Sequence, residues 1–239
     1  MISSAWITGA SGGIGLAIAE SLAVEGADLV LQYRQNAEPL KDLQLRYPDQ
    51  SIELIQADFR DVHTSLEAFR GLPAPKAVIH CSGYDFPGLF QDETLLSIQN
   101  QVNADLIVPM MLTRQVVTEM INNKNGVILF ITSIWGQTGS AMEVLYSTVK
   151  SGQHGLIRAL SDELAPSGIR VNGIAPGFVD TPMVQGYSDE EKQSILDEIP
   201  AGRFGSPEDV ARTVCFLLDD ASSYINGQII GLNGGWYRG

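Results

Sequence analysis

A tyrosine and a lysine near the middle of the chain have a spacing that could support proton transfer. The segment LYSTVKSGQHG at 145–155 places the phenol of Tyr146 and the ammonium of Lys150 four residues apart, so in a helix both leave the same face, one turn apart. A free phenol, with a pKa of about 10, donates protons poorly at neutral pH, but a nearby ammonium favours the phenolate and lowers that pKa. The pair could be a general acid and base, or a surface pair of no consequence.

The elements that must position this pair form an alternating pattern of β-rich runs and amphipathic helical stretches. Ile14, Ile18 and Leu22, for example, fall four residues apart on one face of a predicted helix. The β-rich runs are mostly apolar throughout, which is typical of parallel strands covered on both faces. We predict an α/β fold with one doubly wound, Rossmann-like parallel sheet of about seven strands and helices on both faces. The predicted strands are 5–8, 28–33, 51–57, 77–81, 126–132, 169–175 and 227–232.

The bulk composition restricts the functions open to this chain. Its 239 residues are 44% hydrophobic and 18% charged, which is ample material for a core, and no linker or repeat divides them, so we predict a single domain at 1–239. A formal net charge of −13 argues against binding to nucleic acid or anionic lipid. No apolar run reaches the eighteen or so residues of a membrane-spanning helix, and no leader precedes the first predicted strand. We therefore expect a cytoplasmic protein.

The cysteines and histidines show no metal-ligand pattern. Cys81 and Cys215 lack ligand spacing, and we expect both to be buried free thiols in a reducing cytosol. The three histidines are scattered along the chain, so we expect no metal site.

A glycine-rich loop follows the first predicted strand. TGASGGIG, from Thr8 to Gly15, leads into a predicted helix at the carboxyl end of the sheet, where doubly wound folds bind their ligands. Glycines let the backbone approach a diphosphate, and the new helix offers free N–H groups and the positive end of its dipole. The spacing of Gly9, Gly13 and Gly15 differs from the dinucleotide fingerprint G-x-G-x-x-G, so a tight strand-to-helix turn is the alternative. The position of the loop favours nucleotide binding.

Five motifs occur in a fixed order along the chain. They are TGASGGIG, Asn103 in QVNAD, Ser133 in FITSIWG, the YSTVK pair, and APGFVDTPM at 175–183. In this order, and with thirteen residues from Ser133 to Tyr146, they resemble the short-chain dehydrogenase/reductase family. The similarity extends over essentially the whole chain, to YINGQIIGLNGGW near the C-terminus, and is greatest to the bacterial 3-oxoacyl-acyl-carrier-protein reductases.

The resemblance implies reduction of a ketone with a nicotinamide cofactor, in which hydride goes to carbon and a proton to oxygen. Tyr146 matches the proton donor of the family, and Lys150 matches the lysine that assists it and holds the nicotinamide ribose. Ser133 would hydrogen-bond the substrate carbonyl and stabilise developing negative charge on its oxygen. Asn103 would bind a water that links Lys150 to solvent. Taken singly, Ser133 could be an ordinary strand-end serine and Asn103 an amide at a helix bend, but the matched set favours catalysis.

The resemblance also implies the contacts of the cofactor, in the phosphate loop, the adenine site and the loop that covers the nicotinamide. Val179 in that last loop would act through its backbone. The predicted cofactor residues are Gly9, Ser11, Gly12, Ile14, Arg34, Asp58, Phe59, Gly83, Tyr146, Lys150, Pro176, Gly177, Val179 and Thr181.

One segment departs from the family. After the fourth predicted strand, His80-Cys81-Ser82-Gly83 stands where most relatives have Asn-Asn-Ala-Gly. Only Gly83 is kept, so close backbone approach to the adenosine is preserved while the side-chain contacts are in doubt. We expect His80 to be a packed, hydrogen-bonded residue; a catalytic role is the alternative.

The end of the second predicted strand bears on the choice between NADP and NAD. An NAD site usually has an acid there that binds the ribose 2′-hydroxyl, whereas this chain has Tyr33 followed by Arg34, and Asp28 lies at the start of the strand. A planar guanidinium suits the 2′-phosphate of NADP. Against this, Gly12 stands where NADP-binding members often have a basic residue, and Arg34 could be a solvated arginine. We expect NADP(H), with NAD(H) as the alternative.

The resemblance thus predicts NADPH-dependent reduction of a 3-oxoacyl thioester, linked to acyl carrier protein, in fatty-acid biosynthesis. The alternative is a related enzyme that acts on another small carbonyl or secondary alcohol, because substrate choice depends on the segment at about 183–205. This segment is predicted to be an acidic helix over the site, started by Ser188 and Glu191 as a capping box, or simply a solvated surface helix. A second helix start follows at Ser206-Pro207. A non-catalytic sensor or scaffold is a remote alternative, since the tyrosine, lysine and serine are all present.

Members of the family usually form homotetramers. The two long helices that pair in such assemblies are predicted here at 103–121 and 151–165. Both carry more apolar surface than one face of a sheet covers, which favours an interface.

Carrier-protein reductases also use two basic positions near the site entrance to hold their acidic partner. One matches Lys124 and the other falls on Ser167. Arg158 and Arg170 are near in sequence and could substitute, or they could be ordinary surface cations.

Overall fold

The computed structural model, which describes residues 2–83, 87–181 and 186–238, is built around one parallel sheet of seven strands. The strand order is β3-β2-β1-β4-β5-β6-β7, and every neighbouring pair is parallel. The predicted fold class and all seven predicted strands are confirmed. Their bounds are β1 Ser4–Thr8, β2 Asp28–Tyr33, β3 Ile52–Gln56, β4 Ala77–His80, β5 Gly126–Ile131, β6 Ile169–Pro176 and β7 Ile229–Leu232.

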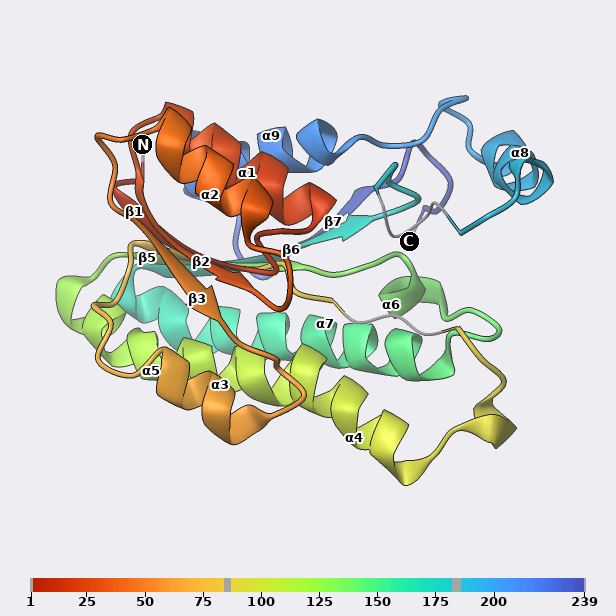
Figure 1. Cartoon of the computed structure of the whole chain (residues 1–239), viewed down its shortest axis with the longest axis horizontal. Helices are drawn as coiled ribbons and strands as arrows, with labels where there is room; N and C mark the ends of the chain where they lie inside the picture. The colour runs from red at the N-terminus through yellow and green to blue at the C-terminus, as the bar shows by residue number, and fades with distance from the viewer. Residues whose placement is uncertain (1, 84–86, 182–185, 239) are drawn as a thin grey trace.

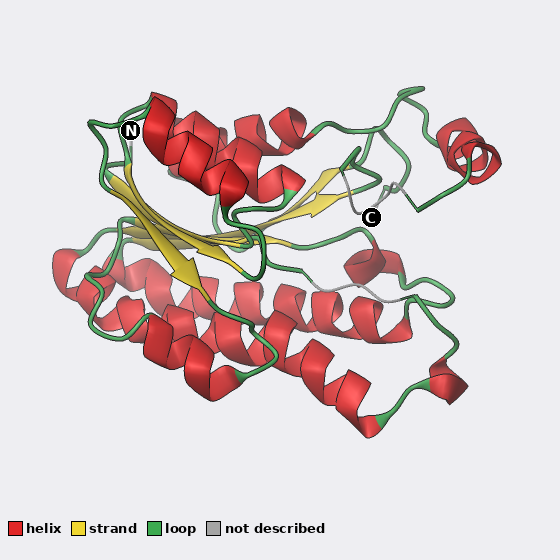
Figure 2. Cartoon of the chain, in the orientation of Figure 1, coloured by secondary structure: helices red, strands yellow, loops and turns green. Residues whose placement is uncertain are grey.

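Helices cover both faces of the sheet (Figures 1 and 2). One layer contains α1 (Gly13–Val24), α2 (Glu38–Arg46) and α9 (Pro207–Leu218). The opposite layer contains α3 (Val62–Ala68), α4 (Leu95–Val102), α5 (Val108–Asn123) and α7 (Val144–Leu164). The short α6 (Trp135–Thr138) and the separate α8 (Asp189–Glu198) lie beyond the carboxyl ends of the strands.

The two layers enclose two hydrophobic cores because successive side chains of a strand point to opposite faces. In β1, Ala5 and Ile7 belong to the core under α1 and α9, whereas Trp6 belongs to the core under α5 and α7. Trp6 packs there against Phe69, with ring centroids 5.2 Å apart. Buried apolar side chains on both faces of the central strands explain why these strands read as continuous apolar runs.

Local sequence signals set several helix ends. Ser188 and Glu191 form the predicted capping box of α8, and Ser206 caps α9 with Asp209 at the third position and proline at the start. Between α4 and α5 the chain forms a wide π-helical turn at Asn103–Ile107. Such turns occur often at functional sites.

Candidate active site

The strand order creates a crevice at the carboxyl edge of the sheet. The chain passes from β1 to β2 and β3 on one side, then returns to place β4 on the other side of β1. Loops after β1 and β4 therefore diverge in opposite directions, and doubly wound folds bind ligands at this point. The predicted site residues lie in the loops that follow β1, β2, β3, β4, β5 and β6 and on the helices beside them.

The glycine loop after β1 is shaped by close approaches of its backbone. Gly9 has a φ of +64°, and a Cβ there would lie 2.7 Å from Ser82 Cα, in the loop after β4. A Cβ on Gly15 would lie 2.3 Å from Gly9 O. Gly12 occupies the N-cap of α1 and has no side chain to cap its first turn. The first turn of α1 therefore presents backbone N–H groups to the crevice, as a diphosphate would require.

Gln32 connects this loop to the segment after β3, where the adenine contacts are predicted. Its side chain is buried, accepts a hydrogen bond from Gly9 N at 2.7 Å and donates one to Ala57 O at 2.7 Å. Gln32 was not among the predicted site residues. A polar residue at an inward position of an apolar strand was the available signal.

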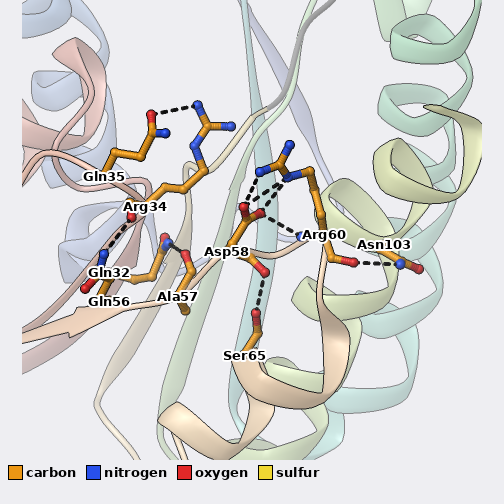
Figure 3. A network of polar contacts seen from close by, with 9 residues as sticks. All are labelled: Gln32, Arg34, Gln35, Gln56, Ala57, Asp58, Arg60, Ser65 and Asn103. Atoms are coloured by element: carbon orange, nitrogen blue, oxygen red, sulfur yellow. Dashed lines mark hydrogen bonds and ion pairs between the residues drawn. The ribbon is translucent and has the colours of Figure 1, made fainter. Parts of the chain in front are cut away.

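Beyond Gln32, an ion pair joins Asp58 and Arg60 after β3 (Figure 3). Arg60 Nε donates to the two carboxylate oxygens of Asp58 at 2.9 and 3.0 Å, and chiefly these hydrogen bonds lower the pKa of the Asp58 carboxyl. Arg34 is exposed, lies beside this pair in Figure 3, and its charge also contributes to the lowered pKa. Asn103 Nδ2 donates to Arg60 O at 2.9 Å, so Asn103 supports the loop that carries Asp58.

The unusual segment after β4 is held from β1 and from α5. Thr8 Oγ1 accepts hydrogen bonds from the backbone N–H groups of Cys81 and Ser82, both at 3.1 Å. His80 is buried and packs against Phe130, with ring centroids 4.6 Å apart. Its Nε2 lies 2.9 Å from Thr113 Oγ1. Burial lowers the pKa of His80 to about 3. The expectation of a packed, hydrogen-bonded histidine is therefore confirmed.

The two cysteines are free, as predicted, but they are only partly buried. Burial of its sulfur raises the pKa of the Cys81 thiol to about 12. A thiol with this pKa is neutral at physiological pH.

Tyr146 and Lys150 lie on one face of α7, as their spacing predicts. The Nζ atom of Lys150 is 5.3 Å from the centre of the Tyr146 ring, and the Lys150 side chain is only 2% exposed. Nζ also lies 3.4 Å from Ile131 O, at the end of β5, two residues before Ser133. A Cβ on Gly83 would be 3.8 Å from the same Nζ. Lys150 Nζ therefore lies close to the end of β5 and to Gly83 after β4, as well as to Tyr146 on α7.

Ser133 follows β5 and is 7% exposed. Its Oγ accepts a hydrogen bond from Trp135 N at 3.1 Å, which orients the hydroxyl at the start of α6. Gly136 lets α6 approach α7 closely, because a Cβ there would lie 3.0 Å from Lys150 Cβ. The helix that follows Ser133 thus packs directly on α7 at Lys150.

A charged partner of Lys150 was missed. Asp105 lies in the π-helical turn, is completely buried, and its Oδ1 is 3.2 Å from Lys150 Nζ. Burial is the largest single effect and lowers the pKa of Lys150, but the charge and hydrogen bond of Asp105 and the nearby Tyr146 together outweigh it, so the pKa is raised. An acid within the otherwise apolar stretch NADLIVPMM was the signal that could have indicated it.

The loop after β6 and the C-terminal segment close the far side of the site. Gly177 N donates to Leu232 O at 3.0 Å, and Val179 is buried and bridges to Gly205. The predicted motif at 175–183 and the predicted covering segment at about 183–205 are described only in part, because residues 182–185 lie outside the described residues. Trp236 Nε1 donates to Glu198 Oε2 at 3.0 Å at the end of α8, and its ring contacts Trp135 at 5.3 Å. The C-terminal segment thus links α8 to the helix that follows Ser133.

The predicted carrier-docking residue lies elsewhere. Lys124 ends α5 just before β5 begins at Gly126, whereas Ser133 follows the other end of β5. A six-residue strand separates the two edges by about 20 Å. The expectation that Lys124 lies near the site entrance of its own chain is therefore wrong.

These features fit a dinucleotide with a nicotinamide ring. The uncapped first turn of α1 suits its phosphates, and the buried Lys150 ammonium suits its ribose hydroxyls.

Within the ranges that the structure describes, no helix combines the length and apolar character needed to cross a membrane.

Comparison with known proteins supports the same conclusion. A family profile described as enoyl-(acyl carrier protein) reductase matches residues 9–237. An uncharacterized oxidoreductase of Bacillus subtilis, YmfI, is 42% identical over 241 residues, which is 99% of this chain and 100% of the relative. The 3-oxoacyl-[acyl-carrier-protein] reductase of Aquifex aeolicus is 33% identical and covers 97% of this chain and 96% of its own.

A solved structure extends the comparison to the fold. It is a protein from Beutenbergia cavernae, assigned as an NAD(P)-dependent gluconate 5-dehydrogenase, with NADP bound at low occupancy. It superimposes with a TM-score of 0.91 at 30% identity, covering 98% of this chain and 96% of that one.

Proposed function

The chain belongs to the short-chain dehydrogenase/reductase family, and from that premise we propose that it uses NADPH to reduce a 3-oxoacyl thioester, carried by acyl carrier protein, to the 3-hydroxyacyl thioester. The observation that carries the proposal is the buried Lys150 ammonium beneath the Tyr146 ring, beside the strand end that leads to Ser133. Relatives that are 3-oxoacyl-[acyl-carrier-protein] reductases, such as that of Aquifex aeolicus, support the substrate class.

Each residue has a separate task in this proposal. The nicotinamide supplies hydride to the carbonyl carbon when it is bound. Tyr146 donates a proton to the carbonyl oxygen, and the ammonium of Lys150 stabilises the phenolate that remains. Ser133 donates a hydrogen bond to the same oxygen as negative charge develops on it. Asn103 keeps the loop of Asp58 in place and holds a water through which the proton is replaced.

For the cofactor, we propose that the loop residues Gly9, Ser11, Gly12 and Ile14 bind the phosphates and that Arg34 binds the 2′-phosphate of NADP. The exposed guanidinium of Arg34, and the absence of an acid at the end of β2, support NADP over NAD. Asp58 and Phe59 would contact the adenine, Gly83 the adenosine, and Pro176, Gly177, Val179 and Thr181 the nicotinamide. We further propose a cytoplasmic homotetramer.

A second candidate is a reductase or dehydrogenase of another small carbonyl or alcohol. The relative assigned as a gluconate 5-dehydrogenase supports it, because the fold and cofactor site of the two enzyme classes would be alike. The difference would lie in the segment around α8 that covers the site.

One assay separates these candidates. Initial rates with NADPH would be measured on 3-oxoacyl thioesters, on 2-enoyl thioesters, and on small diketones and keto sugar acids. We expect kcat/KM to be highest for the 3-oxoacyl thioesters. A clear preference for a compound without a thioester would overturn the leading proposal in favour of the second, and reduction of the enoyl thioesters alone would overturn both.

A further inference from the structure

Two opposite charges are buried against one another in the core of the proposed site. Lys150 and Asp105 are 2% and 0% exposed, and Nζ lies 3.2 Å from Oδ1. A buried ion pair is weak support for stability, because removing two charges from water costs about as much as their attraction returns, and apolar side chains of similar size often serve as well. The pair therefore calls for an explanation other than stability.

Asp105 is itself fixed by two neutral amides. Gln101 Nε2 donates to Asp105 Oδ2 at 2.8 Å, and Gln153 Nε2 donates to the main-chain oxygen of Asp105 at 2.8 Å. Gln101 lies four residues before Asp105, and Gln153 lies three residues after Lys150 on α7. The carboxylate thus occupies one position, aimed at the ammonium.

The π-helical turn carries both Asp105 and Asn103. Asn103 and Asp105 are two residues apart, and in a regular helix their side chains would diverge by about 200°. Asn103 reaches Arg60 O on one side while Asp105 reaches Lys150 on the other. The turn at Asn103–Ile107 therefore serves both ends of the site.

Few charged or titratable groups face Lys150. They are Asp105 from the π-helical turn, Tyr146 and His154 from α7, and Cys81 from the end of β4. Burial raises the pKa of the Cys81 thiol to about 12 and lowers that of His154 to about 4, so both are neutral at working pH. Asp105 is thus the one permanent counter-charge among the described groups around the ammonium.

We propose that Asp105 is a positioning residue for Lys150, whose carboxylate keeps the buried ammonium charged and in place across the alkaline range in which the tyrosine works. The proposal rests on the proposed function only for the role of Tyr146; the pairing itself does not. Without the carboxylate, burial would release the proton of Lys150 at lower pH, and the phenolate and the cofactor ribose would lose their cation.

The test is the isosteric variant Asp105→Asn. We expect its kcat/KM for ketone reduction to fall at least about tenfold between pH 8 and 10 relative to wild type at the same pH. NADPH affinity, followed by tryptophan fluorescence, should weaken over the same range, which gives a readout that needs no turnover. Glu119→Gln is the matched control, since it makes a carboxylate-to-amide change at an exposed position of α5 and leaves both buried charges. It should keep the pH dependence of wild type.

Thermal unfolding tests the pairing independently of activity. Lys150→Met leaves a buried carboxylate without its cation, so its Tm should fall further than that of the double variant Lys150→Met/Asp105→Asn. Additive Tm changes would overturn the pairing. Coupled Tm changes with an unaltered pH dependence in Asp105→Asn, or an equal alkaline loss in Glu119→Gln, would overturn the positioning role. If wild type reduces no ketone, the proposed function fails, and NADPH binding and the Tm values still decide this inference.

Discussion

The ammonium of Lys150 lies 5.3 Å from the centre of the Tyr146 ring, one turn further along α7. At this distance, and with the lysine side chain buried, solvent screens the charge weakly, so the cation favours the phenolate more than an exposed lysine would. This relationship is the basis of the first prediction.

Tyr146→Phe should reduce turnover by at least about 10²-fold, because it removes the one oxygen that can deliver the proton while keeping the ring. Cofactor affinity should persist within a few fold, as measured by fluorescence titration. Tyr47→Phe is the control, since Tyr47 lies at the end of α2, in the helical layer on the opposite face of the sheet from α7. Near-normal turnover in Tyr146→Phe, with the chemical step limiting, would exclude Tyr146 as the donor.

Arg34→Ala should lower the ratio of kcat/KM with NADPH to kcat/KM with NADH by about 10- to 100-fold, because the variant loses a charge-assisted hydrogen bond to the 2′-phosphate. Rates with NADH should change little. Arg46→Ala, which removes an exposed arginine paired with Glu20 on α1, is the matched control. An unchanged ratio in Arg34→Ala would show that the guanidinium does not bind the 2′-phosphate.

The sheet could be predicted because its cause is local in the sequence. Runs such as GVILFI at β5 are buried along their whole length, and only a strand covered on both faces requires that composition. Capping boxes at Ser188 and Ser206 are equally local, since the cap and the acid it bonds lie three residues apart.

The site could be predicted only where spacing within one element carries the information. Tyr146 and Lys150 are one helical turn apart, so their meeting follows from α7 alone. Asp105 and Lys150 are far apart in the sequence and meet through a π-helical turn that no local pattern announced. The prediction for Lys124 was wrong for a related reason: Lys124 is only nine residues before Ser133 in sequence, but a parallel strand carries the chain across the sheet in that interval.

Acid stability should depend on His80. Its pKa is about 3 in the folded protein and near 6.5 when unfolded, so below pH 6.5 the unfolded chain binds a proton that the fold does not, and stability falls as pH falls. Between pH 7 and pH 5, the free energy of unfolding measured in urea should fall by about 2 kcal/mol less in His80→Asn than in wild type. His63→Asn, at an exposed position, is the control. An equal pH loss in His80→Asn and wild type would contradict the buried neutral ring.

The proposed tetramer can be tested at Gly155, an exposed position of α7. Among the large apolar side chains of α7, Ile157 is buried, Leu156 and Leu160 are half-buried and Val144 is exposed. Small residues such as Gly155 are also exposed on this helix. A glycine within a helix costs about 1 kcal/mol relative to alanine, a cost that close packing of a second helix would offset. No described atom lies within 4 Å of a Cβ built at Gly155, so Gly155→Lys leaves the single chain undisturbed.

Light scattering should therefore give four chains for wild type and fewer for Gly155→Lys, with the Tm of the variant showing that it remains folded. Asp42→Lys, on the exposed side of α2, should leave the mass unchanged. A wild-type monomer at micromolar concentration would contradict the assembly, and an intact tetramer in Gly155→Lys would place the interface elsewhere.

Lys124 provides the last prediction, on the acidic carrier. Because Lys124 and Ser133 lie at opposite edges of the sheet, a carrier held at Lys124 could serve only the site of another chain in the assembly. Lys124→Glu should therefore lower kcat/KM for a carrier-bound 3-oxoacyl substrate several-fold, and more at 0.01 M salt, where the screening length grows to about 30 Å, than at 0.1 M. A small thioester should be reduced as before, and Lys41→Glu, on α2, should affect neither substrate. If Lys124→Glu slows both substrates alike, or neither, the carrier does not dock at this surface. The proposal of a small-carbonyl reductase would then gain support.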